Sequence, residues 1–270
     1  MYHVTISLSK ALKLLTKLSL SANVYLASDI HLGPSIPRTN QAFYKFLEQA
    51  AEQADSLILV GDIFNYWIGD DIAIQHPEPW LVEAIAHLQS FAKQKPLYFL
   101  HGNRDFLMGH DFAHLIGATL LPEQILLEVD HQLVYLSHGD ELCSDDKGFM
   151  LFRYWTRKAW LQNIFFKLPM KWRIAIANRA RSQSKDKQAA ITYDHSKGEV
   201  AETAVNAIFK QYPSLNGMIH GHTHKPQAHQ IEVNDKAYWR LVLPDWELDH
   251  ARNRSGFAIL NKDGFQLISH

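Results

Sequence analysis

The stretch Val24-Tyr-Leu-Ala-Ser-Asp-Ile-His31 joins a run of apolar residues to an Asp-x-His pair. Ser56-Leu-Ile-Leu-Val-Gly-Asp62 repeats the arrangement, with an apolar run followed by Gly-Asp. Between them, Asn40–Ala54 has the apolar spacing of a helix, and Trp80–Gln94 follows as a second helix. Short apolar strands that alternate with such helices predict a layered α/β fold.

Polar residues follow the apolar runs directly. Further strands are expected at Leu97–Leu100, Leu133–Ser137, Met218–His220, Tyr238–Leu243 and Gly256–Leu260. Three of them lead into polar segments, His101-Gly-Asn-Arg-Asp105, His138-Gly-Asp140 and Gly221-His-Thr-His224. Sites in open α/β sheets form at the carboxyl ends of strands. We therefore expect five strand ends to converge on one crevice.

The residue types at these strand ends are typical of a metal centre. In Asp-x-His and His-x-His, a step of two residues along an extended chain places both side chains on one face. Oxygen and nitrogen donors without cysteine favour Mn, Fe, Zn or Co over Mg or Ca. One such motif alone is more often an ordinary turn, but five in order, each after an apolar run, indicate a centre with two ions. The candidate ligands are Asp29, His31, Asp62, Asn103, His138, His222 and His224.

These ordered motifs resemble those of the calcineurin-like metallophosphoesterases. The resemblance implies a four-layer α/β/β/α sandwich and a dinuclear centre in which Asp62 bridges the two ions. It assigns the other ligands to one ion (Asp29, His31, His224) or to the second ion (Asn103, His138, His222). Asp62, Asn103 and His138 would thus act in catalysis through the metal centre. Two ions about 3.5–4 Å apart can activate a bridging hydroxide and hold a phosphoryl group for in-line displacement.

Arg104 departs from the pattern of that family. Many members have a histidine at this position, which helps to protonate the leaving group. Arginine cannot act as an acid near neutral pH, but its planar guanidinium pairs well with phosphate oxygens. We therefore expect Arg104 to bind a phosphate. Because a phosphate leaving group needs less protonation than an alkoxide, this favours cleavage of a pyrophosphate over cleavage of a phosphodiester.

The total charge hides two oppositely charged parts. The 270 residues contain 27 Lys plus Arg and 28 Asp plus Glu, a net charge of −1. Lys147–Lys187, however, holds eleven basic residues and one acid, so this segment carries about +10 and the rest of the chain about −11. The segment is also aromatic and has no strand pattern. We interpret residues 145–200 as an inserted helical cap, with Pro169 between two helices, on a core of residues 23–144 and 201–270.

Residues 1–22 contain no acid and place Lys10, Lys13 and Lys17 among leucines. The lysines interrupt the apolar region that a signal peptide needs. A weakly ordered extension or an amphipathic helix on a membrane surface is expected instead. The chain has no run of 18 apolar residues that would predict a transmembrane helix. Its one cysteine, Cys143, excludes an intramolecular disulfide and suits a reducing compartment.

Longer motifs narrow the resemblance. Asp62–Asp71, His101–Gly109, His138–Asp146 and His220–Pro226 look like the corresponding segments of the UDP-2,3-diacylglucosamine pyrophosphatase family. Members of that family hydrolyse UDP-2,3-diacylglucosamine to UMP and 2,3-diacylglucosamine 1-phosphate, a step of lipid A synthesis in Gram-negative bacteria. We expect a metal-activated hydroxide to attack the α-phosphorus, which is attached to uridine. The resemblance implies two Mn²⁺ per subunit. It also implies a peripheral enzyme on the cytoplasmic face of the inner membrane.

The same resemblance implies a set of substrate contacts. Residues 184–200 depart from the pattern of the family, so Lys185 and Lys197 are alternatives for the cap lysine. The expected contacts are Asn103, Arg104, Asp146, Ser184, Lys187, Gln188 and His222.

The composition of the cap agrees with a lipid-linked UDP-sugar. Aromatic side chains can line an acyl groove, and Arg and Lys can meet the diphosphate and an anionic membrane surface. Each aromatic alone can equally pack the cap onto the core, and a basic segment can bind nucleic acid, which would make a nuclease. We expect no nucleic acid and infer no protein partner. The alternatives are another nucleotide pyrophosphatase or phosphodiesterase of the superfamily, and a non-catalytic scaffold, against which the complete ligand set argues.

Overall fold

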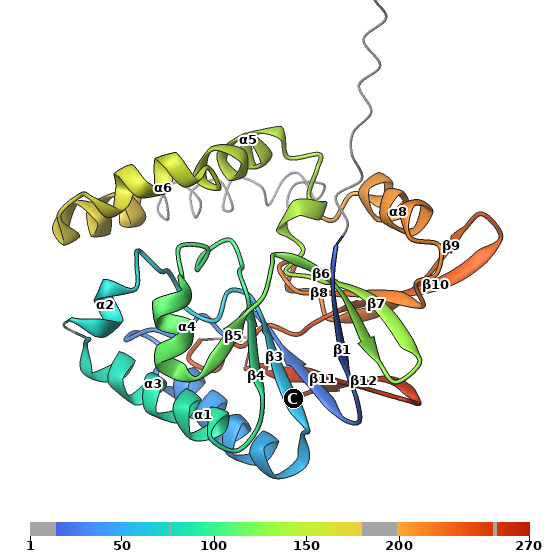
Figure 1. The fold of residues 1–270 in the computed structure, drawn as a ribbon, viewed down its shortest axis with the longest axis horizontal. Helices are drawn as coiled ribbons and strands as arrows, with labels where there is room; N and C mark the ends of the chain where they lie inside the picture. Colours follow the sequence, from blue (N-terminus) through green and yellow to red (C-terminus); the bar gives the residue numbers. More distant parts are fainter. Residues whose placement is uncertain (1–14, 76, 180–198, 251–252) are drawn as a thin grey trace, which may run out of the picture.

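The computed structural model describes residues 15–75, 77–179, 199–250 and 253–270. Within them, two six-stranded sheets form the centre of the molecule (Figure 1). The first sheet has the order β12-β11-β2-β3-β4-β5 and contains β2 (Val24–Ala27), β3 (Ser56–Val60), β4 (Leu97–Leu100), β5 (Ala118–Leu120), β11 (Gly256–Asn261) and β12 (Gly264–Ser269). The second has the order β1-β6-β7-β8-β10-β9 and contains β1 (Thr16–Leu20), β6 (Gln124–Val129), β7 (Gln132–Ser137), β8 (Gly217–His220), β9 (Gln227–Val233) and β10 (Lys236–Val242).

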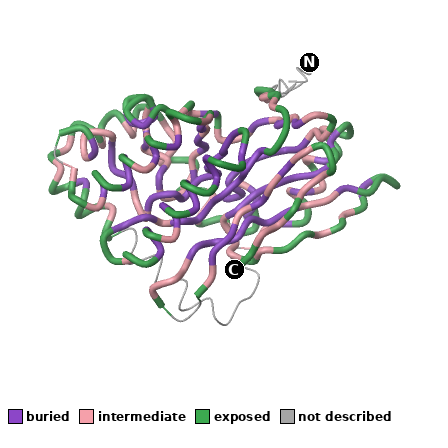
Figure 2. Tube along the Cα trace, turned by 90° about the horizontal axis from the view of Figure 1, so that it is seen from below, coloured by how far each residue is buried: buried purple, intermediate pink, exposed green. Residues whose placement is uncertain are grey.

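Helices cover the outer faces of both sheets. The core helices are α1 (Pro37–Gln53), α2 (Asp71–Ile74), α3 (Pro79–Ala92), α4 (His110–Ile116) and α8 (Glu202–Gln211), and a short 3₁₀ helix spans Asp140–Leu142. One apolar core lies between the first sheet and α1, α3 and α4, a second lies between the two sheets, and a third lies under α8. The buried residues follow the strands through the molecule (Figure 2). The predicted four-layer α/β/β/α sandwich is therefore confirmed.

The central strands are buried on both faces, which explains their uninterrupted apolar sequences. Tyr25 and Leu57 face the core under the helices, while Val24 and Ile58 face the core between the sheets. Because β2, β3 and β4 are parallel, their carboxyl ends lie at the same edge of the first sheet. Strands β7 and β8 are likewise parallel in the second sheet. The fold thus gathers the segments that follow these five strands.

The two predicted helices begin slightly earlier than expected. Instead of starting at Asn40 and Trp80, α1 and α3 start at Pro37 and Pro79. Proline suits the first turn of a helix because the amide hydrogen that it lacks has no partner inside the helix there. In α1, the apolar side that includes Phe43 is buried against the first sheet.

The expectation of an extension outside the core over residues 1–22 is wrong for Thr16–Leu20. These residues form β1, which pairs in parallel with β6 at the edge of the second sheet. Lys17 and Ser19 both bind Glu128 of β6, at 2.8 and 2.9 Å. Alternation of polar and apolar residues is the pattern of a half-exposed strand, and the lysine that argued for an extension lies on its exposed face. Residues 1–14 lie outside the described residues.

The cap crosses over the core as a series of helices (Figure 1). It begins with α5 (Lys147–Thr156) and α6 (Ala159–Phe166), and residues 170–179 are helical too, so that Pro169 lies between two helices. Neither α5 nor α6 contains a buried residue. Among the residues described, we find no helix with the length and apolar character needed to span a membrane.

Candidate metal centre

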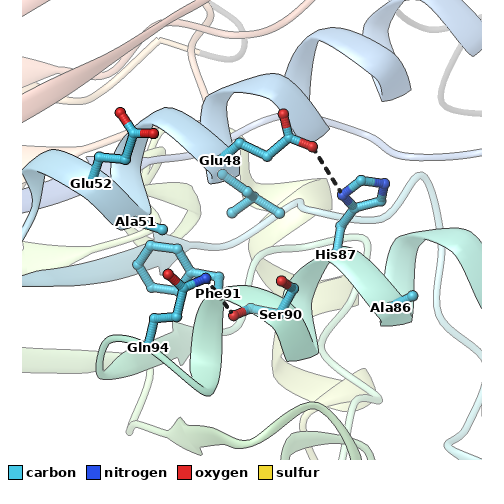
Figure 3. Close-up of a pocket in the computed structure, with 9 residues that line it drawn as sticks. Glu48, Ala51, Glu52, Ala86, His87, Ser90, Phe91 and Gln94 are labelled. Atoms are coloured by element: carbon cyan, nitrogen blue, oxygen red, sulfur yellow. Dashed lines mark hydrogen bonds and ion pairs between the residues drawn. The ribbon is translucent and has the colours of Figure 1, made fainter.

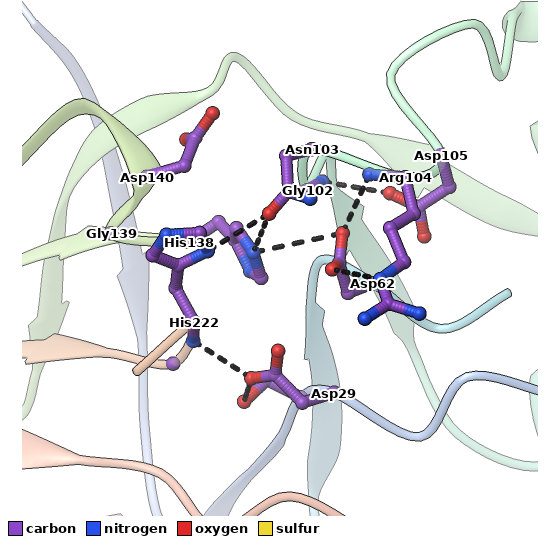
Figure 4. Close-up of polar contacts among 12 residues, drawn as sticks. Asp29, Asp62, Gly102, Asn103, Arg104, Asp105, His138, Gly139, Asp140 and His222 are labelled. Carbon is purple, nitrogen blue, oxygen red and sulfur yellow. Dashed lines mark hydrogen bonds and ion pairs between the residues drawn. The ribbon is translucent and has the colours of Figure 1, made fainter. Parts of the chain in front are cut away.

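Seven candidate ligands come together where the two sheets meet. Asp29 and His31 follow β2, Asp62 follows β3, and Asn103 follows β4. From the second sheet, the remaining ligands follow β7 (His138) and β8 (His222, His224). Figure 4 shows Asp62 beside both His138 and Asn103, with Asp29 opposite His222. The convergence that the strand ends predict is therefore present in the fold.

The backbone at the centre adopts an uncommon conformation. Five of the seven candidates have a positive φ, namely Asp29 (55°), His31 (58°), Asp62 (54°), His222 (68°) and His224 (55°). This left-handed region is costly for residues other than glycine, and such strain is typical of functional sites. Hydrogen bonds hold the turns in place: the amide of Asp29 donates to Gly61 O at 3.1 Å, and that of His31 to Asp62 O at 3.0 Å.

One group of ligand atoms surrounds Asp29. Its Oδ1 lies 3.2 Å from Nε2 of His224 and 4.0 Å from Nε2 of His31. The facing atoms of these three residues all lie within 4.8 Å of one another. The other carboxylate oxygen, Oδ2, accepts hydrogen bonds from Ser28 Oγ at 2.8 Å and from the amide of His222 at 2.9 Å. One oxygen of Asp29 is thus directed at the histidines, where it can bind a cation.

A second group surrounds the amide of Asn103. Its Oδ1 lies 2.9 Å from Nδ1 of His222 and 3.2 Å from Nε2 of His138. Asp62 joins the two groups, because its Oδ1 lies 3.6 Å from Nε2 of His138 and its Oδ2 lies 3.4 Å from Nε2 of His31. A carboxylate with one oxygen facing each group has the placement that a bridging ligand requires.

The electrostatics of the centre suit a cation. Burial alone would raise the pKa of Asp62, but His138, His31 and Arg104 lower that pKa to well below its ordinary value. Burial likewise opposes the charged form of His138, yet the carboxylates of Asp62 and Asp29 raise its pKa to about 9. The pKa of His222 falls to about 4, because burial and the charge of His138 both disfavour its protonation. Two buried ionised carboxylates facing imidazoles form a donor set that fits divalent transition metals.

Further residues orient these donors. Nδ1 of His138 donates to the carbonyl of Val60 at 3.0 Å, which directs Nε2 into the centre. Nδ1 of His224 lies 3.3 Å from Oδ2 of Asp245, which Arg254 also binds at 2.5 Å. Such second partners fix the ring orientation of metal-binding histidines. Asp245 was not predicted, because its role depends on a contact between residues that lie 21 positions apart.

Asp105 holds two loops of the centre together. Its Oδ1 accepts from the amide of Gly102 at 2.7 Å and its Oδ2 from the amide of Ile63 at 2.8 Å. Burial, together with the charge of Asp62, raises the pKa of Asp105 to about 7. Gly102 must remain small, because a Cβ there would lie 2.1 Å from Oδ1 of Asp62. The Asp of the Gly-Asn-Arg-Asp motif therefore has a positioning role that the motif alone does not reveal.

Arg104 lies beside Asp62 with its side chain about one-third exposed. Its amide donates to Asp62 Oδ1 at 2.8 Å, its Nε lies 3.4 Å from Asp62 Oδ2, and its guanidinium donates to Asn65 Oδ1 at 3.1 Å. The guanidinium thus reaches the edge of the centre from the side of the first sheet (Figure 4). This placement leaves an accessible cationic group next to the candidate ligands.

Of the predicted cap contacts, Asp146 lies in the part of the chain that the structure describes. Asp146 lies immediately before α5 and is the N-cap of that helix, because its Oδ1 accepts a hydrogen bond from the amide of Phe149 at 2.9 Å. The ring of Phe149 stacks on His222 with centroids 5.9 Å apart, which brings the start of α5 to the centre. Three predicted contacts lie outside the described residues (Ser184, Lys187, Gln188), as do their alternatives Lys185 and Lys197.

A separate surface pocket lies between α1 and α3 (Figure 3). It has a volume of about 380 Å³, and its lining includes Glu48, His87 and Gln94. None of the candidate ligands or described substrate contacts lines it. This pocket is therefore separate from the candidate ligands at the strand ends.

Comparison with known proteins agrees with this geometry. The family model described as calcineurin-like phosphoesterase matches residues 22–226. A curated protein of Bordetella parapertussis named UDP-2,3-diacylglucosamine hydrolase is 40% identical over 253 residues, which are 93% of this chain and 96% of that protein. A protein with the same name from Ralstonia nicotianae is 38% identical over 92% of this chain and 92% of its own length. Another from Escherichia coli O81 is 38% identical over 84% of this chain and 92% of its own length. The chain belongs to the calcineurin-like phosphoesterase family.

Proposed function

We propose that the protein hydrolyses the pyrophosphate bond of UDP-2,3-diacylglucosamine and releases UMP and 2,3-diacylglucosamine 1-phosphate, a step in lipid A synthesis. The observation that carries the proposal is the set of donor residues that face one another beside Arg104. The chain that contains them is about 40% identical to curated proteins named UDP-2,3-diacylglucosamine hydrolase. Water adds across the anhydride: its oxygen joins the phosphorus attached to uridine, and the lipid sugar phosphate leaves.

In this proposal two Mn²⁺ ions occupy the centre. When bound, they would supply an activated water and positive charge that stabilises the phosphoryl group. Asp62 has one oxygen facing each group of donors, which supports a bridging role. Five of the donors have the positive φ that is typical of functional sites, which also supports the proposal. The proposed ligands are Asp29, His31, Asp62, Asn103, His138, His222 and His224.

Arg104 would bind the pyrophosphate. Its guanidinium can pair with two phosphate oxygens at once, and its anchor on Asn65 Oδ1 at 3.1 Å keeps it beside the centre. It stays protonated near neutral pH, so it would stabilise the negative charge of the leaving phosphate without donating a proton. Asn103 and His222 lie at the same edge of the centre and would contact the substrate there as well.

The cap would receive the acyl chains and contact the membrane. Its helices expose large apolar side chains to solvent, where isolated apolar residues are common but a dense series is not. Lysines accompany them, including Lys158, whose ammonium lies 3.9 Å from the ring centroid of Tyr154. This mixture fits the anionic cytoplasmic face of an inner membrane, to which the protein would bind peripherally. The exposed residues include Leu151, Phe152, Trp155, Trp160, Ile164 and Trp172.

Product analysis in ¹⁸O-labelled water tests the reaction. Metal-depleted protein that has been reloaded with Mn²⁺ should convert UDP-2,3-diacylglucosamine to UMP, and the label should appear in UMP. Label in the sugar phosphate alone would show attack on the other phosphorus and overturn the proposed chemistry. Hydrolysis of phosphodiesters at a higher kcat/KM than this pyrophosphate would favour the phosphodiesterase alternative.

A further inference from the structure

Three arginines of the cap bind the core. Within residues 145–179, the only residue that is buried is Arg173. It donates to Ile68 O at 2.7 Å and pairs with both carboxylate oxygens of Asp71. At the opposite end of the cap, the side chains of Arg153 and Arg157 are only 16% and 15% exposed. We expected the basic residues of the cap to contact phosphate and a membrane surface, but these three arginines bind groups of the core instead.

Arg153 and Arg157 share two acids of the core. Nε of Arg153 lies 2.7 Å from Oδ2 of Asp140, and its Nη2 lies 2.6 Å from Oε2 of Glu123. Arg157 lies 2.8 Å from Oε1 of Glu123 and 3.5 Å from Oδ2 of Asp140. Asp140 is almost fully buried, so its charge needs these partners. Since Asp140 lies two residues after His138, the network reaches the loop that carries one candidate ligand.

Arg157 also reaches the loop that carries Asn103. Its guanidinium donates to the carbonyl of Gly102 at 3.0 Å and lies 4.4 Å from the ring centroid of Phe106. These two contacts flank Asn103 on both sides in the sequence. The amide of Gly102 is held by Asp105 at 2.7 Å, so the peptide groups before and after Gly102 are fixed by different partners. Figure 4 shows Gly102 and Asn103 together at the edge of the centre, with Asp140 near His138.

We infer that Arg157 is a positioning residue for the metal centre: it ties α5 to the Asn103 loop and sets the position of the Asn103 amide oxygen. Arg153 supports it by holding Glu123 and Asp140. The inference rests on the proposed metal centre. It explains why α5, which buries no residue, can keep a fixed position over the candidate ligands. It also means that the cap, proposed to bind the lipid, is joined to the loops that carry residues proposed to bind metal.

Manganese binding to the full chain tests this inference. Free Mn²⁺ can be followed by its EPR signal during titration of metal-depleted protein. We expect two sites in the wild type and, in Arg157→Gln, a loss of about tenfold or more in affinity at one site only, as is usual when a residue that orients metal ligands is removed. Arg157→Lys, which keeps the charge but cannot make all the contacts, should lose less. The variant Arg173→Gln is the control, because it loosens the cap at Ile68 and Asp71, neither of which is next to a candidate ligand in the sequence.

The outcomes separate the inference from the proposed function. Two sites of wild-type affinity in folded Arg157→Gln would overturn the positioning role and leave the proposed function standing. An equal loss in Arg173→Gln would also overturn it, because the effect would then come from general loosening of the cap. If Arg157→Gln fails to fold by circular dichroism, Arg157→Lys decides by the same criteria. A wild type that binds no Mn²⁺ would overturn the proposed metal centre and, with it, the role of Arg157.

Discussion

In the candidate metal centre, charged side chains such as Asp29 and Asp62 are buried, whereas in the cap apolar side chains such as Trp160 and Trp172 are exposed. In most proteins charged side chains are exposed and large apolar side chains are buried, so the two regions depart from this rule in opposite directions. Bound cations would stabilise buried carboxylates that face histidines, and a lipid surface would cover exposed aromatic residues beside lysines. The two departures agree with the ligands proposed for the two regions, metal in the centre and lipid at the cap.

Removing one buried charge from the centre should give the largest effect. In Asp62→Asn, we expect kcat to fall by about 10³-fold or more, because the amide cannot supply a charged oxygen to both groups of donors. The fold should persist, since the amide has the same shape as the carboxylate. Steady-state kinetics at saturating Mn²⁺ and circular dichroism check this. Near-wild-type turnover would contradict the bridging role.

A pair of aromatic substitutions sharpens the contrast in burial. Phe99→Ala should lower the free energy of unfolding by about 3–5 kcal/mol, because Phe99 is fully buried under the helices of the first sheet. Trp172→Ala should change it by less than about 0.5 kcal/mol, because 65% of that residue is exposed. It should nevertheless weaken binding to vesicles of anionic lipid. Urea unfolding and vesicle sedimentation measure the two quantities; a large loss of stability in Trp172→Ala would assign the residue to packing of the cap.

Arg104 tests the phosphate-binding edge of the centre. In Arg104→Gln, we expect kcat/KM to fall by about 10²-fold, since a paired charge-assisted contact to the pyrophosphate is lost. Mn²⁺ affinity should be retained, because Arg104 is not a proposed ligand. Arg38→Gln, at an exposed arginine of α1, serves as the matched control. An unchanged kcat/KM in Arg104→Gln would exclude the proposed contact.

The stability of metal-free protein should depend on pH through His138. Its pKa in the folded state is about 9, against an ordinary value near 6.5, so the folded state binds the proton more tightly. This stabilisation is fully present below about pH 6.5 and is lost as the pH rises through 9. Urea unfolding in EDTA should therefore show a decrease of about 1–3 kcal/mol from pH 6.5 to pH 9.5. His138→Gln should remove most of that decrease; the same slope in the variant would contradict the assignment.

The sequence predicts the metal centre better than the cap, for a physical reason. Each candidate ligand lies in a segment that follows an apolar strand, so a local pattern and the rule that strand ends converge suffice to bring Asp29, Asp62 and His138 together. Asp245 escaped prediction because its contact with His224 is made only in the folded chain. The left-handed φ of Asp62 likewise has no signal in the sequence.

The cap and the edge of the second sheet show what local patterns miss. The basic composition of the cap was predictable, but the partners of Arg153 and Arg173 were not, because Glu123 and Asp71 lie in distant segments. β1 was missed because Thr16–Leu20 reads as a lysine-containing stretch among leucines until β6 is placed beside it. Pairing between distant segments, more than residue type, decides these features.

The most direct test of the account compares two substrates. Hydrolysis of UDP-2,3-diacylglucosamine and of a soluble UDP-sugar without acyl chains would be measured at equal concentrations, with metal-depleted enzyme and with enzyme reloaded with Mn²⁺. We expect Mn²⁺-dependent release of UMP from the lipid substrate, with a kcat/KM at least about 10²-fold above that for the soluble sugar, because only the lipid can use the apolar cap. Equal kcat/KM values for the two substrates, or hydrolysis that does not depend on metal, would contradict it.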